Sequence, residues 1–395
     1  MKLAVVSIGS FDAQYSDYHI MRDIIIGLLS KGHTVELVQK QYFETPNYPK
    51  AFRQYLGKQL IVHNIRFKKK AKSNLKARYL ADIFYYYQAC RLLKKSKPDK
   101  IFLQSNNTAF LMVFYAKHIL KRPLLYNEQD IFPENAYFAG ILSERSVVYK
   151  VTHMLQKYAY KNATVLSTIS EDMKSTIVTR YGIPENNVAV IYNWGHEELK
   201  AHSESENVFL QKYPKKPDEF RVVYAGNLGK MQNVELVLEA AALMKDDPEI
   251  TFYIVGGGVN EEQLKIYAKE KALSKVTFVG MQPSEEVADL YASADINVIP
   301  LIHGLIYAAL PSKTADCLIA GKPMITCLDE HSKFVQLIRS YGIVNTGTEC
   351  PEQLRKTILQ IQCFGLKCRN AELWKDYFMA EKSVAAYCDL VEEMV

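Results

Sequence analysis

The stretch YAGNLGKMQNVELVLEAA, residues 224–241, indicates the fold class of this chain. It begins with the end of an apolar run and continues through a loop that contains Gly226 and Gly229. Apolar residues then recur at helical spacing. A strand, a glycine-bearing loop and a helix in this order are typical of a βαβ unit in a parallel sheet.

The same order recurs on both sides of this stretch. Strand-like runs followed by helical patterns are KLAVVSI (2–8), TVELVQ (34–39), DKIFLQS (99–105), PLLYNEQ (123–129), ATVLSTIS (163–170), ITFYIVGGG (250–258), VTFVG (276–280), INVIP (296–300) and PMITC (323–327). This recurrence predicts an α/β protein with two Rossmann-like, doubly wound domains.

The polar stretch 196–219 separates the two series and is interpreted as a linker or hinge. We expect a first domain over 1–195, a second domain over 220–375, and a C-terminal helix within 376–395 that packs back on the first domain. Two such domains are expected to face each other across a cleft at the carboxyl ends of their strands, where open α/β sheets bind ligands.

Composition excludes several classes of protein. The chain has 395 residues, of which 48% are hydrophobic and 23% charged, so sizeable cores are possible and global disorder is not expected. A net charge of +6 is too small to indicate a nucleic-acid partner, and the seven scattered cysteines form no disulfide or zinc pattern. Neither a signal peptide nor a membrane-spanning run is apparent, so we expect a cytoplasmic protein.

The stretch YAALPSKTADCLIAG, residues 307–321, suggests an anion site. Ser312 could simply cap the helix that starts here. Capping does not explain Lys313, because a cation is unfavourable in the first turn unless an anion lies over the helix end. Asp316, one turn further on, could accept hydrogen bonds from a diol.

Three other motifs have a functional and a structural interpretation. Lys230 could meet a phosphate or be a solvated loop lysine, and Gly256 could allow close approach of a ligand or only form a turn. In YNEQDIFPEN (126–135), Glu128, Asp130 and Glu134 could do acid–base work. The alternative is a polar loop that leads into a helix.

Together these motifs resemble family 4 glycosyltransferases, which have the GT-B fold. The second half is similar to their donor-binding domain through YAGNLG, YIVGGG, VTFVGMQPSEEVADLYASADINVIP and LPSKTADCLIAGKPMI. DIFPEN, GNLG and PSK are similar to enzymes that build bacterial O-antigen and capsule. The resemblance implies retaining, metal-independent transfer of a hexose or N-acetylhexosamine from a nucleotide-sugar, with UDP the expected nucleotide, to a lipid-linked saccharide. It implies no cofactor.

The resemblance also assigns roles to residues. The family has two glutamates eight residues apart, of which the second aligns with Asp316, at the nucleotide ribose, and the first with Ala308, where it is missing. Asn227 and Gln232 replace the family's arginine and lysine, so we expect Lys313 and Lys230 to supply the missing charge. The predicted catalytic residues are Asp130, Glu128 and Lys313, and the predicted donor-binding residues are Asn227, Lys230, Gly256, Gly280, Met281, Pro311, Ser312, Lys313 and Asp316.

A basic stretch in the first half suggests a membrane partner. Between Glu44 and Asp82 there is no acidic residue, and aromatic residues are interleaved with many lysines and arginines. The predicted membrane and acceptor residues are Lys68, Lys69, Lys70 and Lys72. Such a surface suits the anionic inner face of the cell membrane. A solvated basic face is the alternative, and no RNA-binding module is apparent.

Two other functions stay open. One is a nucleotide-sugar 2-epimerase, an enzyme class that shares the two-domain architecture. The other is a degenerate transferase that only binds nucleotide-sugar as a partner subunit, which the alanine at position 308 would favour.

Overall fold

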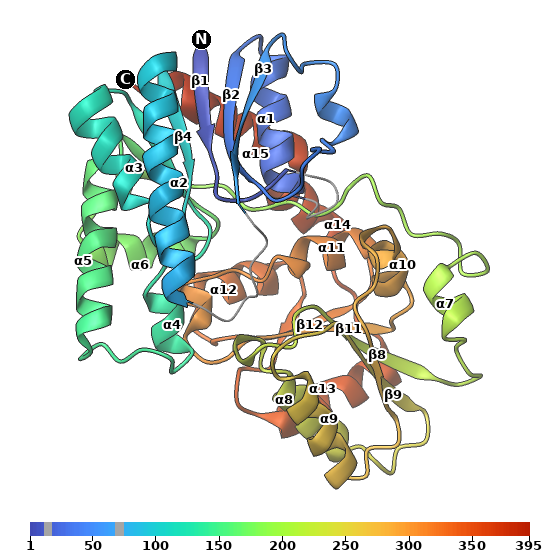
Figure 1. Ribbon diagram of the computed structural model, residues 1–395. Coiled ribbons are helices and arrows are strands. Elements are labelled where there is room, and N and C mark those ends of the chain that lie inside the picture. Colours follow the sequence, from blue (N-terminus) through green and yellow to red (C-terminus); the bar gives the residue numbers. More distant parts are fainter. Residues whose placement is uncertain (12–17, 68–74) are drawn as a thin grey trace. The chain divides into compact units, whose positions relative to one another are not determined.

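The computed structural model describes residues 1–11, 18–67 and 75–395. The chain forms two compact units, each built on a parallel sheet (Figure 1). The first unit comprises Met1–Tyr137, Leu142–Tyr192 and Glu381–Val395, and the second comprises Phe138–Ile141 and Asn193–Ala380. The prediction of two Rossmann-like, doubly wound domains is confirmed.

The sheet of the first unit has seven parallel strands in the order β3-β2-β1-β4-β5-β6-β7. The strands are β1 (Lys2–Val6), β2 (Thr34–Gln41), β3 (Leu60–Arg66), β4 (Lys100–Gln104), β5 (Leu124–Glu128), β6 (Val165–Thr168) and β7 (Val188–Val190). From β1 to β3 each new strand is added on one side, and from β4 to β7 on the other, so the order of strand addition reverses between β1 and β4. These two strands are parallel neighbours, and Val5 pairs with Phe102. Such reversals are where open α/β sheets bind ligands.

Helices cover both faces of this sheet. They are α1 (His19–Ser30), η1 (Lys50–Phe52), α2 (Leu75–Ser96), α3 (Phe110–Tyr115), η2 (Ala116–Leu120), α4 (Glu134–Phe138), α5 (Val147–Asn162), α6 (Glu171–Tyr181), η3 (Glu185–Asn187) and α15 (Ala380–Glu393). Helices α2, α3 and α5 lie side by side along one face (Figure 1).

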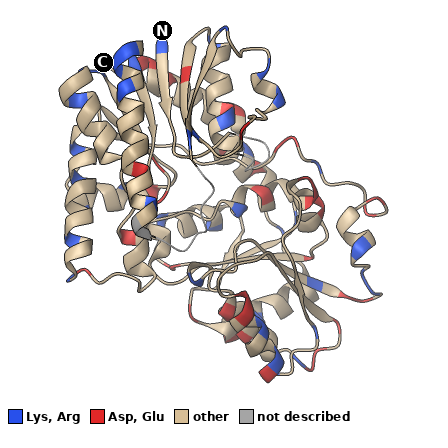
Figure 2. Ribbon diagram, viewed as in Figure 1, with Lys and Arg blue, Asp and Glu red and all other residues tan. Residues whose placement is uncertain are grey.

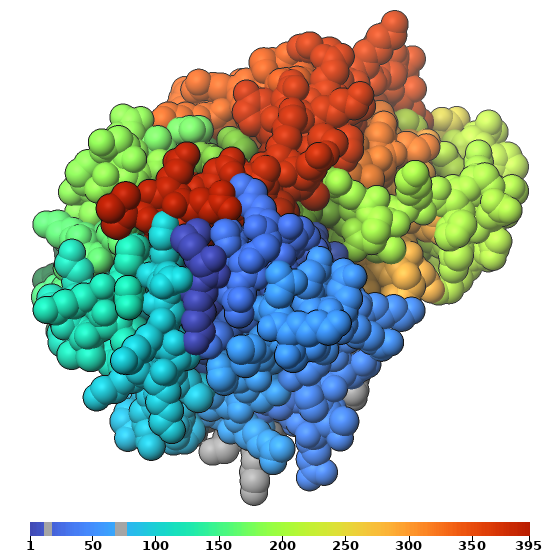
Figure 3. Space-filling model, turned by 90° about the horizontal axis from the view of Figure 1, so that it is seen from above, coloured from blue at the N-terminus to red at the C-terminus, as the bar shows by residue number. Residues whose placement is uncertain are grey.

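The C-terminal helix α15 packs on the other face, against α1. A methyl group built on Gly27 would lie 2.4 Å from a side-chain carbon of Val384, so glycine allows the two helices to approach closely. Lys31 Nζ lies 2.7 Å from the Asp389 carboxylate, and Lys100 Nζ donates to the Glu392 carbonyl oxygen. Figure 3 shows this C-terminal segment beside the N-terminal strand.

The sheet of the second unit has six parallel strands in the order β10-β9-β8-β11-β12-β13. The strands are β8 (Phe220–Ala225), β9 (Ile250–Val255), β10 (Val276–Val279), β11 (Ile296–Pro300), β12 (Met324–Cys327) and β13 (Val344–Asn345). The helices are α7 (Val208–Lys212), η4 (Lys230–Gln232), α8 (Val234–Ala242), α9 (Glu261–Glu270), η5 (Ser284–Glu286), α10 (Val287–Ala292), η6 (Leu305–Tyr307), α11 (Lys313–Ala320), α12 (Lys333–Ser340), α13 (Pro351–Phe364), α14 (Asn370–Leu373) and η7 (Trp374–Phe378).

The strands form the core because they are apolar on both faces. Val222, Ile254, Ile296 and Ile325 come from four different strands of the second sheet and are all fully buried. Strands that are buried on both faces give short continuous apolar runs in the sequence, as a helix-covered parallel sheet requires. In this sheet the order of strand addition reverses between the parallel neighbours β8 and β11. Both strands end beside the candidate site described below.

The stretch 196–219, interpreted as a hinge from its polarity, belongs to the second unit and contains α7. The backbone amides of His202 and Val208 each donate to the Asp289 carboxylate at 2.8 Å. Asp289 is buried, and these bonds lower the pKa of its carboxyl although desolvation opposes them. Within the described ranges, no helix is long and apolar enough to cross a membrane.

Candidate functional site

The candidate site lies at the carboxyl ends of β8 and β11, on the two sides of the reversal in the second sheet. The loop after β8 contains Gly226 and Asn227, and the segment after β11 leads to the first residue of α11, Lys313. Parallel strands end at the same edge, so these two segments, which are about 85 residues apart in the sequence, are brought together.

Lys313 is buried against aromatic and backbone groups. Its side chain is only 8% exposed, and Nζ lies 4.1 Å from the centroid of the Tyr224 ring. Nζ donates to Gln232 Oε1 at 3.3 Å, and within the described part of the chain it pairs with no carboxylate. Desolvation lowers the pKa of Lys313 to about 7. An anion that enters this position would favour the charged ammonium group and would itself be bound by it.

Two glycines allow the loops around Lys313 to touch. Gly226 has φ +144° and Gly256 has φ +137°, which side chains rarely adopt. A methyl group built on Gly256 would lie 1.9 Å from the carbonyl oxygen of Gly226, and one built on Gly226 would lie 2.8 Å from Lys313 Nζ. Gly256 therefore has a packing reason to be glycine, because the loops after β8 and β9 cross in direct contact.

The start of α11 is not capped by a side chain. Ser312 has helical backbone angles, makes no capping hydrogen bond and is exposed, so the interpretation of Ser312 as an ordinary N-cap is wrong. Pro311 beside it is buried, and its carbonyl oxygen accepts from the Thr314 amide at 3.1 Å. A helix start with no side-chain cap among the described residues, an exposed hydroxyl and a buried lysine suits an anion.

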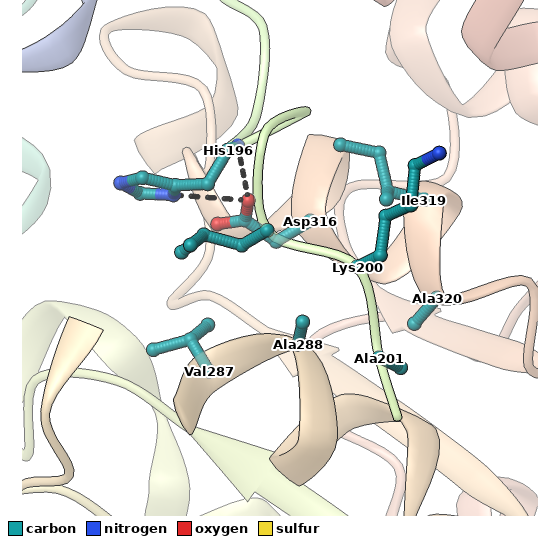
Figure 4. A pocket seen from close by; sticks show the side chains of 9 residues that line it. His196, Lys200, Ala201, Val287, Ala288, Asp316, Ile319 and Ala320 are labelled. Atoms are coloured by element: carbon teal, nitrogen blue, oxygen red, sulfur yellow. Dashed lines mark hydrogen bonds and ion pairs between the residues drawn. The ribbon is translucent and has the colours of Figure 1, made fainter. Parts of the chain in front are cut away.

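Asp316 lies one turn further along α11 and lines a pocket (Figure 4). Its Oδ1 accepts from the backbone amide of His196 at 2.9 Å and lies 3.2 Å from His196 Nδ1. Oδ2 has no hydrogen-bond partner among the residues that the structure describes. The pocket has a volume of about 240 Å³, and its wall includes the apolar side chains of Val287, Ala288 and Ile319. His196 is a site residue that the sequence analysis missed.

The other predicted donor residues lie around this centre. Asn227 and Lys230 are exposed on the loop after β8, and the Asn227 side chain lies against the backbone of Gly229 and Gly258. Gly280 and Met281 follow the neighbouring strand β10 and are exposed, with open space beside Gly280. The structure thus brings Asn227, Gly256 and Lys313 together and places Gly280 and Met281 at the same edge of the sheet.

The acidic motif of the first unit divides into buried and exposed groups. Glu128, the last residue of β5, is 1% exposed, and its Oε2 accepts from Gln156 Nε2 and the Tyr160 hydroxyl, both at 2.6 Å. Glu134 is fully buried and accepts from the Tyr149 hydroxyl at 3.0 Å. Asp130 is exposed at the end of the strand. The placement of Glu128 therefore supports a packing role and not the contact with substrate that we predicted.

The buried Glu128 predicts a pH dependence of stability. Desolvation raises its pKa from 4.5 to about 8, so folding takes up a proton between these pH values. Stability is therefore lost as pH rises through this window, by at most about 1.4 kcal/mol per pH unit. Glu128→Gln keeps an acceptor for Tyr160 and removes the titration, so we expect its free energy of unfolding to fall less than that of the wild type between pH 5 and pH 8.

Urea unfolding at several pH values measures this difference. Glu185→Gln is the matched control, because the Glu185 side chain is 74% exposed. The same slope against pH in the wild type and in Glu128→Gln would contradict the assignment.

The predicted membrane residues Lys68, Lys69, Lys70 and Lys72 lie outside the described residues.

Comparison with known proteins gives the family. Residues 20–194 match the model of Glycosyltransferase Family 4, and residues 205–358 match that of Glycosyl transferases group 1. The chain belongs to the glycosyltransferases. The resemblance found in the sequence is confirmed. The second match includes the loop after β8, the crossing with Gly256 and the start of α11, so the candidate site of this glycosyltransferase lies in its group 1 domain.

Individual relatives agree with this assignment. The glycosyltransferase is 25% identical over 289 residues to a protein of Pseudomonas aeruginosa named as the glycosyltransferase WbjE, covering 72% of this chain and 71% of that one. It is 26% identical over 217 residues to WcaI of Escherichia coli K12, named as a colanic acid biosynthesis glycosyl transferase, covering 54% and 53%. The crystal structure of Anabaena Alr3699/HepE in complex with UDP-glucose has the same fold, with a TM-score of 0.71, 14% identity and 99% of each chain covered.

Proposed function

We propose that this glycosyltransferase moves a hexose or N-acetylhexosamine from a UDP-sugar to a lipid-linked saccharide, with retention of anomeric configuration, in the synthesis of a surface polysaccharide. The observation that carries the proposal is the buried Lys313 beside the uncapped start of α11. A lysine with no paired carboxylate within the described residues is suited to a diphosphate, the leaving group of such a donor.

The chemistry places negative charge at this helix start. The bond between the anomeric carbon and the diphosphate oxygen breaks, and a bond from the acceptor oxygen forms on the same face of the sugar. The acceptor's proton passes to the leaving phosphate oxygen. Lys313 and the first amides of α11 stabilise the charge that develops on the diphosphate, so we propose that no metal ion is needed.

Two other residues complete the proposed donor and acceptor sites. Asp316 offers its Oδ2, which accepts no hydrogen bond within the described residues, to the ribose diol, and its Oδ1 accepts from the His196 backbone amide. Asp130, the exposed acid after β5, orients the acceptor hydroxyl or the sugar hydroxyls. Ala308, which aligns with a family glutamate, is fully buried and offers no carboxylate. Asn227 and Gln232 stand where the resemblance implies an arginine and a lysine, so we assign the positive charge at the diphosphate to Lys313.

The class of donor and the pathway come from the relatives. The HepE structure contains UDP-glucose, and WcaI is named for colanic acid, a polysaccharide. A second candidate function, 2-epimerisation, would change the sugar of the donor without transferring it. A partner subunit without activity would bind UDP and leave every donor intact.

Substitution of Asp130 by asparagine tests this proposal. We expect Asp130→Asn to lower kcat by about a hundredfold, as loss of a group that orients a reacting hydroxyl does. The Kd for UDP is expected to change less than threefold, because the nucleotide contacts the second unit. UDP release in the presence of a lipid extract measures kcat, and calorimetry measures Kd.

Glu144→Gln is the control, because Glu144 is an exposed acid of the same unit that pairs with Arg180. Equal losses of kcat and of UDP affinity in Asp130→Asn would contradict the assigned role. Conversion of the donor sugar without any transfer would replace the proposal by epimerisation.

A further inference from the structure

His303 and Asp329 form a pair at the carboxyl edge of the second sheet. His303 follows β11 and Asp329 follows β12, and these two strands are parallel neighbours. His303 Nδ1 lies 2.5 Å from Asp329 Oδ1, and Asp329 Oδ2 accepts from the Gly304 amide at 2.9 Å. Both oxygens of the carboxylate therefore hold the loop that carries the histidine.

The two members of the pair differ in exposure. Asp329 is buried, whereas the His303 side chain is 73% exposed. A buried carboxylate needs hydrogen-bond donors, and the imidazole Nδ1–H and the Gly304 amide supply them. In a neutral imidazole, a proton on Nδ1 leaves a lone pair on Nε2. Nε2 has no partner within the described ranges, so the pair presents an oriented hydrogen-bond acceptor.

The backbone beside the histidine is also held on its other side. Gly304 has φ +82°, and a methyl group built on it would lie 2.3 Å from a ring carbon of Phe138, which belongs to the same unit. Only glycine allows the loop to pass so close to this ring. The loop is thus fixed by Asp329 and by Phe138, as a precise binding side chain requires.

The pair lies next to the Lys313 site. The amide of Ile302, the residue before His303, donates to the Met231 carbonyl oxygen at 3.2 Å. The next residue of the same turn η4, Gln232, accepts from Lys313 Nζ. Two adjacent residues of η4 therefore hold the histidine loop and contact the lysine. A donor sugar is bonded directly to the diphosphate, so a diphosphate at Lys313 brings the sugar within reach of the side chains around this turn.

An ordinary surface ion pair is the alternative explanation. Lys265 and Glu261 form such a pair one turn apart on α9, where Figure 2 shows both signs of charge. A pair of that kind joins two solvated side chains and adds little stability. The pair of His303 and Asp329 has instead one buried member and one open nitrogen, and it lies at the strand ends where parallel sheets bind ligands.

We infer that His303 binds the transferred sugar: its Nε2 accepts a hydrogen bond from a hydroxyl of the sugar ring, and Asp329 is the positioning residue that orients the imidazole. A hydroxyl fits better than a second anionic group, because the Asp329 carboxylate beside the ring opposes negative charge. The inference deepens the proposed function and rests on it, because the sugar reaches His303 when its diphosphate is bound at Lys313. His303 thereby helps to select the sugar, since a site that pairs with a hydroxyl rejects analogues that lack it.

Calorimetric titration with UDP, UDP-glucose, UDP-galactose and UDP-N-acetylglucosamine tests the inference. The ratio of the Kd for a UDP-sugar to the Kd for UDP isolates the part of the affinity that depends on the sugar. We expect His303→Ala to raise this ratio about tenfold for the sugar that the wild type binds best, while the Kd for UDP changes less than threefold. An unchanged ratio for all three sugars would overturn the inference.

Two further variants separate the sugar contact from a general effect on the fold. Asp329→Asn keeps an acceptor for the Gly304 amide and removes the charge that orients the imidazole, so we expect the ratio to rise about threefold at unchanged UDP affinity. His331→Ala changes an exposed histidine of the same loop and is expected to match the wild type. Thermal unfolding verifies that the variants are folded.

The outcomes distinguish this inference from the proposed function. Absence of UDP binding by the wild-type protein would contradict the proposed function, and the inference with it. UDP binding that Lys313→Ala weakens, together with a ratio that His303→Ala leaves unchanged, would support the diphosphate site and overturn the sugar contact alone. Equal losses of UDP and UDP-sugar affinity in His303→Ala would also overturn it, because His303 would then act on the diphosphate.

Discussion

Replacement of Lys313 by alanine is expected to lower kcat/KM by about a hundredfold to a thousandfold and to weaken UDP binding by at least tenfold. The lysine is buried against Tyr224 and has no paired carboxylate in the described chain, so its charge is available to a diphosphate. Calorimetric titration with UDP measures the affinity, and UDP release from the donor measures the turnover. Lys322→Ala, just beyond the other end of α11, is the matched control and is expected to bind UDP like the wild type.

The same lysine predicts a pH dependence of binding. Burial lowers its pKa to about 7, so the free protein loses the charge as pH rises through 7, and the bound diphosphate raises this pKa again. Binding at higher pH therefore takes up a proton. UDP affinity is expected to fall from pH 7 to pH 9 by up to about tenfold per pH unit, and Lys313→Ala is expected to lose this slope. An equal slope in both proteins would contradict the assignment.

Substitution of Gly256 by alanine is expected to lower the free energy of unfolding by about 2–4 kcal/mol. The added methyl group would lie 1.9 Å from the Gly226 carbonyl oxygen, and the backbone has φ +137°. The loops after β8 and β9 would have to separate, which also moves the backbone beside Lys313. Urea unfolding measures the stability, and UDP titration of the folded variant measures the effect on the site.

Gly280→Ala is the matched control for stability. It lies at the same edge of the sheet, and a methyl group there meets nothing within 4 Å. Its free energy of unfolding is expected to stay within about 0.5 kcal/mol of the wild-type value. Equal stabilities of Gly256→Ala and Gly280→Ala would show that the crossing of the two loops is not as tight as described.

The fold and the centre of the site follow from local sequence patterns. Apolar runs such as KLAVVSI and ITFYIVGGG are buried on both faces of a parallel sheet, so each run corresponds closely to one strand. Lys313 was predicted from the unfavourable position of a cation in a first helical turn, and the structure places it at such a helix start. In both cases the local sequence was enough to predict where the residues lie in the fold.

The missed features depend on contacts between distant segments. His196 donates a hydrogen bond to Asp316, which lies 120 residues further along the chain, and no local sequence pattern predicts this pair. Glu128 looks like a site residue by its place at a strand end, but its side chain points to Tyr160 on α5.

Titration of the wild-type protein with UDP, GDP, TDP and CMP by calorimetry tests the central claim most directly, because every role proposed for the second unit depends on a bound nucleoside diphosphate. We expect UDP to bind at one site per chain, with proton uptake above pH 7, and the other nucleotides to bind at least tenfold more weakly. Absence of binding by all four nucleotides would contradict the account. It would leave Lys313 as a buried residue of an ordinary helix start.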